Sequence, residues 1–354
     1  LSTGLVAEVG AGLSSGGRRP IVLQFQDDAA SILGVEMGAA HVAVALTDLR
    51  GRVLTWRERK HPVRGDPEGT RELIGQLSRI CLGTREPSTL PLIGIGVAVP
   101  SPVDPGHPHQ LSELILPEWK RHLGLEGLGR EYGVPLRVDN DANLGALAER
   151  WWGAGAGVEN FAYVKVATGV GSGHVIGGEV YRGATGVAGE IGHMAIDPSG
   201  EPCLCGLRGC LATLVGSQAI VRRAQALLGE YADSALAGTE LTIDSIEDAA
   251  LAGDPMALRV TREAAEHLGI ALAGMLNLMN PSRVILGGGL ARLGEILLEP
   301  LRETIRRRTL VSSIAAAEIL TSKLGPRSVA IGASTLILES ALADSRLFGS
   351  VRTS

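Results

Sequence analysis

Residues 193–210 read HMAIDPSGEPCLCGLRGC. It holds one histidine and three cysteines in the spacing H-x9-C-x-C-x4-C, namely His193, Cys203, Cys205 and Cys210. Imidazole and thiolate groups suit Zn²⁺, and four such ligands complete its tetrahedral coordination. The spacing therefore predicts a structural zinc site that has no open position for a catalytic water.

A second interpretation of the same residues stays open. The cysteines could be reduced and packed as small apolar side chains, with an unrelated histidine nearby. A disulfide framework is disfavoured, because three of the four cysteines lie within eight residues in a chain of 354. The fourth, Cys81, falls in an apolar helical pattern and is expected in the core.

The bulk composition is that of a globular protein with two domains. Hydrophobic residues make up 45% and charged residues 20% of the 354 positions. The formal net charge of −5 argues against nucleic-acid binding by the chain as a whole. Neither a secretory signal nor a membrane-spanning run of about 20 apolar residues is evident, so we expect a cytoplasmic protein without a membrane partner.

The hydrophobic pattern predicts two halves built on the same plan. In the first half it indicates strands at Ile32–Glu36, His41–Asp48, Arg52–Arg59, Ile93–Val99 and Leu136–Val138, and helices at 68–82 and 141–152. In the second half it indicates strands at 160–167, 172–177, 179–181 and 284–286, and helices at 213–228, 254–279, 292–308 and 328–342. Strands followed by helices, twice over, favour a duplicated α/β architecture. The residues from Phe348 onward carry no structural signal.

Several short motifs, in this order along the chain, resemble the ROK family, named for its repressors, open reading frames and kinases. They are LGVEMG (33–38), GVAVP (96–100), VDNDAN (138–143), ATGVGSG (167–173), AGEIGH (188–193) with the zinc segment, and ILGGG (285–289). The resemblance implies an actin-like (ribonuclease H-like), duplicated two-domain sugar-kinase fold with a central cleft and a zinc loop at 193–210. It also implies a homodimer or homotetramer.

The resemblance suggests domain boundaries as well. We predict an N-terminal α/β domain at 31–139, which the last helix, 328–342, could join, and a C-terminal α/β domain at 140–327. Residues 1–30 differ from both, with two short strands, Leu5–Val9 and Ile21–Phe25, around a Gly/Ser-rich turn.

The family motifs assign candidate sugar-binding residues. Asp141 matches the base that would take the proton from a sugar hydroxyl if the chain is a kinase. Asn140, Asp141, Glu190 and His193 match positions that contact sugar hydroxyls. Two alternatives stay open: Asp141 could be only a helix N-cap, and Glu190 an ordinary loop carboxylate.

Phosphate recognition departs from the family's kinases. Thr168, Gly169 and Gly171, together with Gly287 and Gly288, retain the expected nucleotide loops. In contrast, Glu36–His41 (EMGAAH) lacks the threonine and lysine that the kinases carry in their first phosphate loop. Ala212 also stands where they have a sugar-contacting glutamate. Mg²⁺ and ATP are therefore expected as cofactors only if the chain is a kinase.

The first residues favour a regulator. Residues 4–6 and 14–20, which include Arg18 and Arg19, resemble the end of the wing of the winged-helix domain that precedes this fold in the family's repressors. A decorative hairpin is the alternative. The leading hypothesis is a sugar-responsive transcriptional regulator, a repressor, that contacts DNA through a winged-helix domain largely absent from this chain. The other hypotheses are an ATP-dependent sugar kinase and a sugar-binding protein with neither activity.

Overall fold

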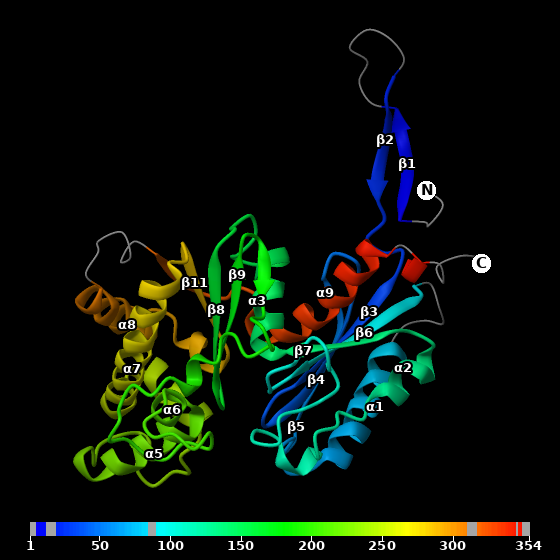
Figure 1. Cartoon of the computed structure of the whole chain (residues 1–354). Coiled ribbons are helices and arrows are strands. Elements are labelled where there is room, and N and C mark those ends of the chain that lie inside the picture. The colour runs from blue at the N-terminus through cyan, green and yellow to red at the C-terminus, as the bar shows by residue number, and fades with distance from the viewer. Residues whose placement is uncertain (1–4, 12–18, 84–89, 310–316, 345, 349–354) are drawn as a thin grey trace.

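Two lobes, each built on a five-stranded sheet, form the body of the molecule (Figure 1). The computed structural model describes residues 5–11, 19–83, 90–309, 317–344 and 346–348. The N-terminal sheet has the order β5-β4-β3-β6-β7, with bounds Val53–Lys60, His41–Thr47, Ser31–Met37, Leu92–Val99 and Leu136–Asn140. The C-terminal sheet has the order β10-β9-β8-β11-β12, with bounds Glu179–Tyr181, Val170–Ile176, Phe161–Val166, Arg283–Gly287 and Glu318–Thr321.

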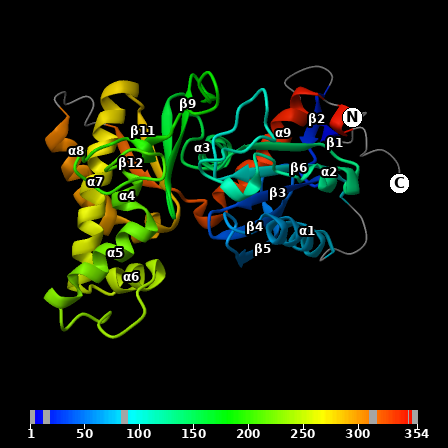
Figure 2. The same ribbon diagram turned by 60° about the horizontal axis from the view of Figure 1, so that its bottom comes forward.

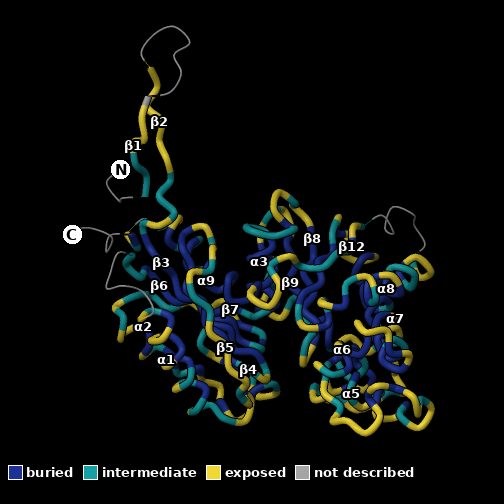
Figure 3. The backbone as a smooth tube through the Cα atoms, turned by 180° about the vertical axis from the view of Figure 1, so that it is seen from behind, coloured by how far each residue is buried: buried dark blue, intermediate teal, exposed yellow. Residues whose placement is uncertain are grey.

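The two sheets share one topology, which confirms the predicted duplication. In each, the first three strands pair antiparallel, and the fourth and fifth run parallel to the first. The central strands are almost entirely buried (Figure 3). Burial on both faces explains why these strands carry so few polar residues. The short strand β12 was not predicted, because only four residues, Glu318–Thr321, carry it.

Most of the helices lie on the outer sides of the two sheets (Figures 1 and 2). In the N-terminal lobe these are α1 (Pro67–Gly83) and α2 (Glu126–Tyr132). In the C-terminal lobe they are α4 (Ala212–Val215), α5 (Ser217–Leu227), α6 (Ile243–Leu251), α7 (Pro255–Met279) and α8 (Glu295–Arg308). The single helix predicted at 213–228 was wrong: Gly216 is extended, with ψ 153°, and divides it into α4 and α5.

Helices α3 (Asp141–Trp152) and α9 (Ser328–Ala343) pack together between the two sheets (Figure 1). Their backbones approach so closely that a Cβ on Gly332 would collide with the carbonyl of Leu144. On its other side, α9 lies on the N-terminal sheet, where a Cβ on Gly96 would collide with the carbonyl of Ala333. The last helix of the chain thus packs against the first lobe. The domain limits 31–139 and 140–327 themselves stay a prediction.

An antiparallel hairpin, β1 (Val6–Ala11) with β2 (Ile21–Phe25), projects from the N-terminal lobe (Figure 1). This confirms the two strands expected there. Residues 1–4 and 12–18, which hold most of the wing-like motif and Arg18, lie outside the described residues. Among the described residues, no helix combines the length and apolar character needed to cross a membrane.

The base of the hairpin is attached to the body through one apolar cluster. Leu5 and Phe25 pack against the buried group that includes Ile32, Leu49 and Phe348, and Trp152 at the end of α3 packs against the same group. Phe348 is 1% exposed although no sequence signal indicated its burial, and residues 349–354 lie outside the described part of the chain. A lone aromatic residue in a short tail has no periodicity from which its burial could be read.

Candidate functional site

The histidine and cysteines of the 193–210 loop converge on one point. One ligand atom from each of His193, Cys203, Cys205 and Cys210 lies within 4.8 Å of all the others. The Cys203 Sγ lies 3.5 Å from His193 Nδ1, and the Cys205 Sγ lies 3.5 Å from the Cys210 Sγ. Four thiolate and imidazole ligands around a tetrahedral metal stand about 3.5–4 Å apart. The loop therefore fits a metal ion of that geometry.

Short turns in the loop bring these ligands together. Residues on either side of the cysteines pair through the bridges Ala195↔Cys210 and Pro202↔Arg208. Gly209 has a φ of 60°, and a Cβ there would collide with the carbonyl of Asp197. Glycine is thus required one residue before the last ligand, because a side chain would both strain the backbone and open the loop.

The two ring nitrogens of His193 face different neighbours. Nδ1 is directed to the cysteines, whereas Nε2 lies 3.8 Å from Glu190 Oε2. A histidine that ligates a metal through one nitrogen is commonly oriented by a carboxylate at the other. His193 therefore links the loop to Glu190, the neighbouring sugar-binding candidate.

Asp141 is the first residue of α3, and the N-cap is Asn140. The Asn140 Oδ1 accepts hydrogen bonds from the backbone N–H groups of Ala142 and Asn143, at 2.9 and 3.2 Å. Its Nδ2 donates to the carbonyl of Ser101. The alternative in which Asp141 is only a helix N-cap is therefore wrong. Its carboxylate is available for another role, while much of the hydrogen-bonding capacity of Asn140 is used in the fold.

Glu190 precedes the short 3₁₀ turn Ile191–His193 and is partly buried. Burial, together with the smaller effect of the negative charge of Asp141, raises the pKa of Glu190 to about 7. Asp141, Glu190 and His193 thus share one region although 52 residues separate the first from the last. Their predicted contacts with sugar hydroxyls stay a prediction.

The predicted nucleotide loops also meet at one end of the C-terminal sheet. Thr168 and Gly169 form the turn between β8 and β9, and Gly171 lies in β9. Gly287 pairs in register with Lys165 of β8, and a Cβ on Gly288 would collide with the carbonyl of Val166. Their role in binding phosphate stays a prediction.

Residues 36–41 correspond in position to the first phosphate loop of the family's kinases. The His41 ring folds back over Gly38, where an added Cβ would collide with it, and His41 Nε2 lies 3.6 Å from Glu36 Oε1. An imidazole next to a buried carboxylate thus stands where the family's kinases place a lysine.

Lys165 was not predicted from the sequence. Its ammonium donates hydrogen bonds to Glu36 Oε1 at 2.8 Å and to Asp141 Oδ2 at 2.9 Å. Burial alone would raise the pKa of Glu36, but Lys165 and His41 outweigh it and lower that pKa to about 2. Burial would likewise lower the pKa of Lys165, and the charges of Asp141 and Glu36 raise it instead. The available signal was a single lysine within the apolar strand FAYVKV (161–166).

A further ion pair that sequence reasoning missed joins the same two lobes. The Arg182 guanidinium, just after β10, contacts Asp139 Oδ2 at 2.7 Å, and Asp139 Oδ1 accepts from Asn143 Nδ2. Asp139 lies at the end of β7, directly before Asn140. The residues next to the candidate site are therefore fixed by a charged network.

The sequence pattern of the ROK family matches residues 32–340, nearly the whole body of the molecule. The chain belongs to the ROK family. The xylose repressor of Caldicellulosiruptor bescii is 30% identical to it over 348 residues, covering 97% of this chain and 86% of that protein. This match shows that the resemblance inferred from the short motifs was correct.

Two solved ROK structures show the fold to be the actin-like one. A ROK family transcriptional regulator, a homologue of the Escherichia coli MLC protein, has a TM-score of 0.80 at 28% identity. Its match covers 99% of this chain and 88% of the regulator. A ROK family glucokinase from Streptomyces griseus, solved with glucose and AMPPNP, has a TM-score of 0.77 at 30% identity. That match covers 87% of this chain and 99% of the glucokinase.

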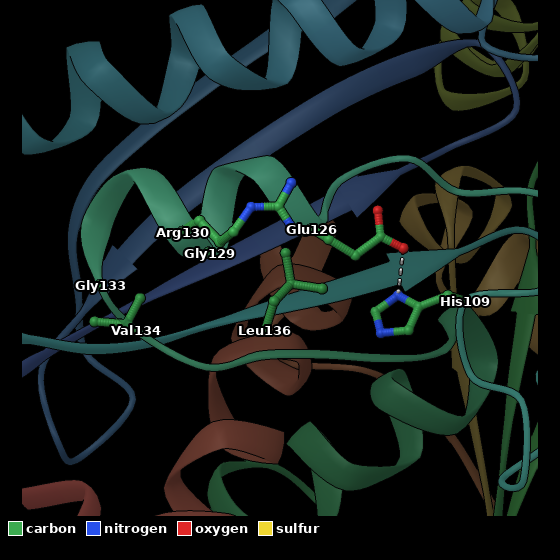
Figure 4. Close-up of a pocket in the computed structure, with 7 residues that line it drawn as sticks. All are labelled: His109, Glu126, Gly129, Arg130, Gly133, Val134 and Leu136. Carbon is green, nitrogen blue, oxygen red and sulfur yellow. Dashed lines mark ion pairs between the residues drawn. The ribbon is translucent and has the colours of Figure 1, made fainter.

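This ROK chain also has a pocket of about 570 Å³ away from the candidate site (Figure 4). It lies beside α2 and is lined by His109, Glu126, Gly129, Arg130, Gly133, Val134 and Leu136. Within this lining, His109 Nδ1 lies 3.6 Å from Glu126 Oε1. None of the predicted sugar, phosphate or metal residues lines it.

Proposed function

We propose that this chain is the sugar-binding part of a sugar-responsive transcriptional regulator, a repressor, of the ROK family. The arrangement of residues 36–41 carries the proposal. His41 folds over Gly38 beside Glu36, so this loop offers neither the threonine hydroxyl nor the lysine with which the family's kinases hold phosphate. The near-complete coverage of the chain by a regulator and by a xylose repressor supports the same conclusion.

We assign Zn²⁺ to the 193–210 loop, because three thiolates and one imidazole favour it over harder cations. The ion has a structural role in this proposal. It anchors His193, and through His193 it positions Glu190, which together with Asn140 and Asp141 would bind the sugar hydroxyls.

Helix α3 offers a route from the sugar to the hairpin. Asp141 begins the helix, and Trp152 ends it against the apolar cluster that holds the hairpin base. A sugar that binds one arrangement of the two lobes better than another shifts the population toward it. In a homodimer, which the family implies, that shift would change the spacing of the paired DNA-binding domains.

The alternative, an ATP-dependent sugar kinase, is supported by Asp141, which is not used as a cap, and by the similarity to the Streptomyces griseus glucokinase. To separate the two, ADP release from Mg·ATP is measured over a panel of glucose, xylose, N-acetylglucosamine and N-acetylmannosamine. Calorimetry with the same sugars runs in parallel. We expect one sugar to bind without nucleotide and none to be phosphorylated. Turnover that Asp141→Asn abolishes would establish the kinase and refute the proposal.

The regulatory part is tested with a winged-helix domain from a ROK repressor joined to Leu1. Mobility-shift titrations use that repressor's operator, with and without the sugar found by calorimetry. We expect the sugar to weaken operator binding at least fivefold, within the usual range of allosteric coupling. Equal operator affinity with and without a bound sugar would refute the effector role.

A further inference from the structure

Lys165 connects the two lobes at the candidate site. It lies in β8 of the C-terminal sheet, and its ammonium reaches Glu36 in β3 of the N-terminal sheet as well as Asp141 at the start of α3. The side chains of Lys165, Glu36 and Asp141 are 11%, 3% and 16% exposed. A charged pair this far from water is screened little, so its partners are held tightly.

The two carboxylates face one cation. Both approach Lys165 Nζ within 2.9 Å, and the other oxygen of Glu36, Oε2, is buried without a hydrogen-bond partner among the described residues. Proteins bind Mg²⁺ through one or two carboxylates of this kind, usually together with substrate phosphates. Here the position between the carboxylates is taken by a group of the chain itself.

We propose that Lys165 is the built-in cation of this site: its ammonium fills the position between Glu36 and Asp141 that a divalent cation would take, so the site receives an uncharged sugar without a metal–nucleotide complex. That the site receives a sugar rests on the function proposed above, whereas the exclusion of the divalent cation does not.

The exclusion follows from charge and from tethering. A divalent cation placed against the same two carboxylates would have to displace the ammonium or share the site with it, and like charges a few ångströms apart repel strongly away from water. Because Lys165 is part of the chain, its ammonium competes for the carboxylates at a high local concentration. Its side chain is also already removed from water. Asp141 meanwhile keeps one oxygen on Lys165, which weakens it as a base toward a sugar hydroxyl.

The experiment measures Mn²⁺ binding, as a probe for divalent cations, by electron paramagnetic resonance on the zinc-loaded protein without nucleotide. The native chain is compared with Lys165→Met and with Lys323→Met, which removes the same charge from an exposed position. We expect Lys165→Met to bind one Mn²⁺ at least tenfold more tightly than the native chain and Lys323→Met to match the native chain. Adding Glu36→Gln to Lys165→Met should remove the gain.

Either of two results overturns the proposal. One is a Lys165→Met protein that binds Mn²⁺ no more tightly than the native chain, and the other is a gain that survives Glu36→Gln. Should Lys165→Met not fold, native and Glu36→Gln proteins decide: equal Mn²⁺ binding supports the built-in cation, and native binding lost in Glu36→Gln refutes it. A Mn²⁺ gain in a chain that binds no sugar would leave Lys165 as inferred and refute the proposed function instead.

Discussion

A Cys205→Ala protein is expected to lose both its metal and its ability to bind sugar. Removing an outer-sphere partner of a metal ligand already costs about 10- to 100-fold in metal affinity, so the loss of a ligand should exceed 100-fold. The loop from Glu190 to Ala212 would then lose its anchor, because the metal would no longer join the four ligand side chains that converge there. Elemental analysis should fall from about one zinc per chain to near zero, and calorimetry should detect no sugar binding.

The matched control is Cys81→Ala. Cys81 is buried in α1, in the other lobe, so this variant removes one thiol without touching the loop. It should retain its zinc and its sugar. Native protein without zinc would contradict the assignment of the metal, and a zinc-free Cys205→Ala protein that still binds sugar would contradict the link from the loop to Glu190.

The second large effect is expected on stability, from Lys165→Met. Removing one partner of a buried ion pair commonly costs about 3–5 kcal/mol, because the other charge is left without compensation. Here two carboxylates lose their shared partner, and Glu36 is only 3% exposed in its side chain. Urea unfolding at pH 7 should show a loss in that range, whereas Lys323→Met should stay within about 0.5 kcal/mol of the native chain.

The loss in unfolding free energy of the Lys165→Met protein should also depend on pH. In the native chain, Lys165 and His41 overcome the effect of burial and hold the pKa of Glu36 at about 2, below its ordinary value of 4.5. Their stabilisation is fully present above pH 4.5 and is lost as the pH falls toward 2. Without Lys165, burial should raise the pKa of Glu36, so the variant gains stability by binding a proton as the pH falls.

The two unfolding curves should therefore approach each other between pH 7 and about 4.5, where the native contribution of Glu36 stays constant. Unfolding free energies of both proteins at pH 7, 6 and 5 test this directly. A deficit that stays constant over this range, or widens on acidification, would show that Glu36 is not the group left uncompensated.

Functional groups that lie close together in the sequence could be predicted best. The ligand spacing from His193 to Cys210 lies within 18 residues, so a short loop with glycine turns must bring these groups together wherever it sits in the fold. The duplicated plan of the two halves was also readable, because buried strands leave long apolar runs. Short elements such as α2, α6 and β12 were missed, since each gives too few residues for a period to emerge.

The candidate site needed the tertiary structure. Asp141 was identified through its motif, but the sequence left its role divided between base and helix cap, and only the cap geometry of Asn140 excludes the second. Lys165 lies outside every motif that was recognised in the sequence. Its role in the site becomes visible only in the fold, where β8 and β3, which belong to different sheets, bring Lys165 into contact with Glu36, 129 positions away in the sequence.

The sequence by itself thus determined the family, the duplicated α/β plan and the loop that brings His193 and three cysteines together. These depend on patterns within a few tens of residues, where spacing and hydrophobicity restrict the chain directly. Only the tertiary structure decided which charges meet: Lys165 with Glu36 and Asp141, and Arg182 with Asp139. Such pairs are set by how two lobes pack, through the close contact of α3 with α9, and electrostatic energy depends on distance in space rather than along the chain.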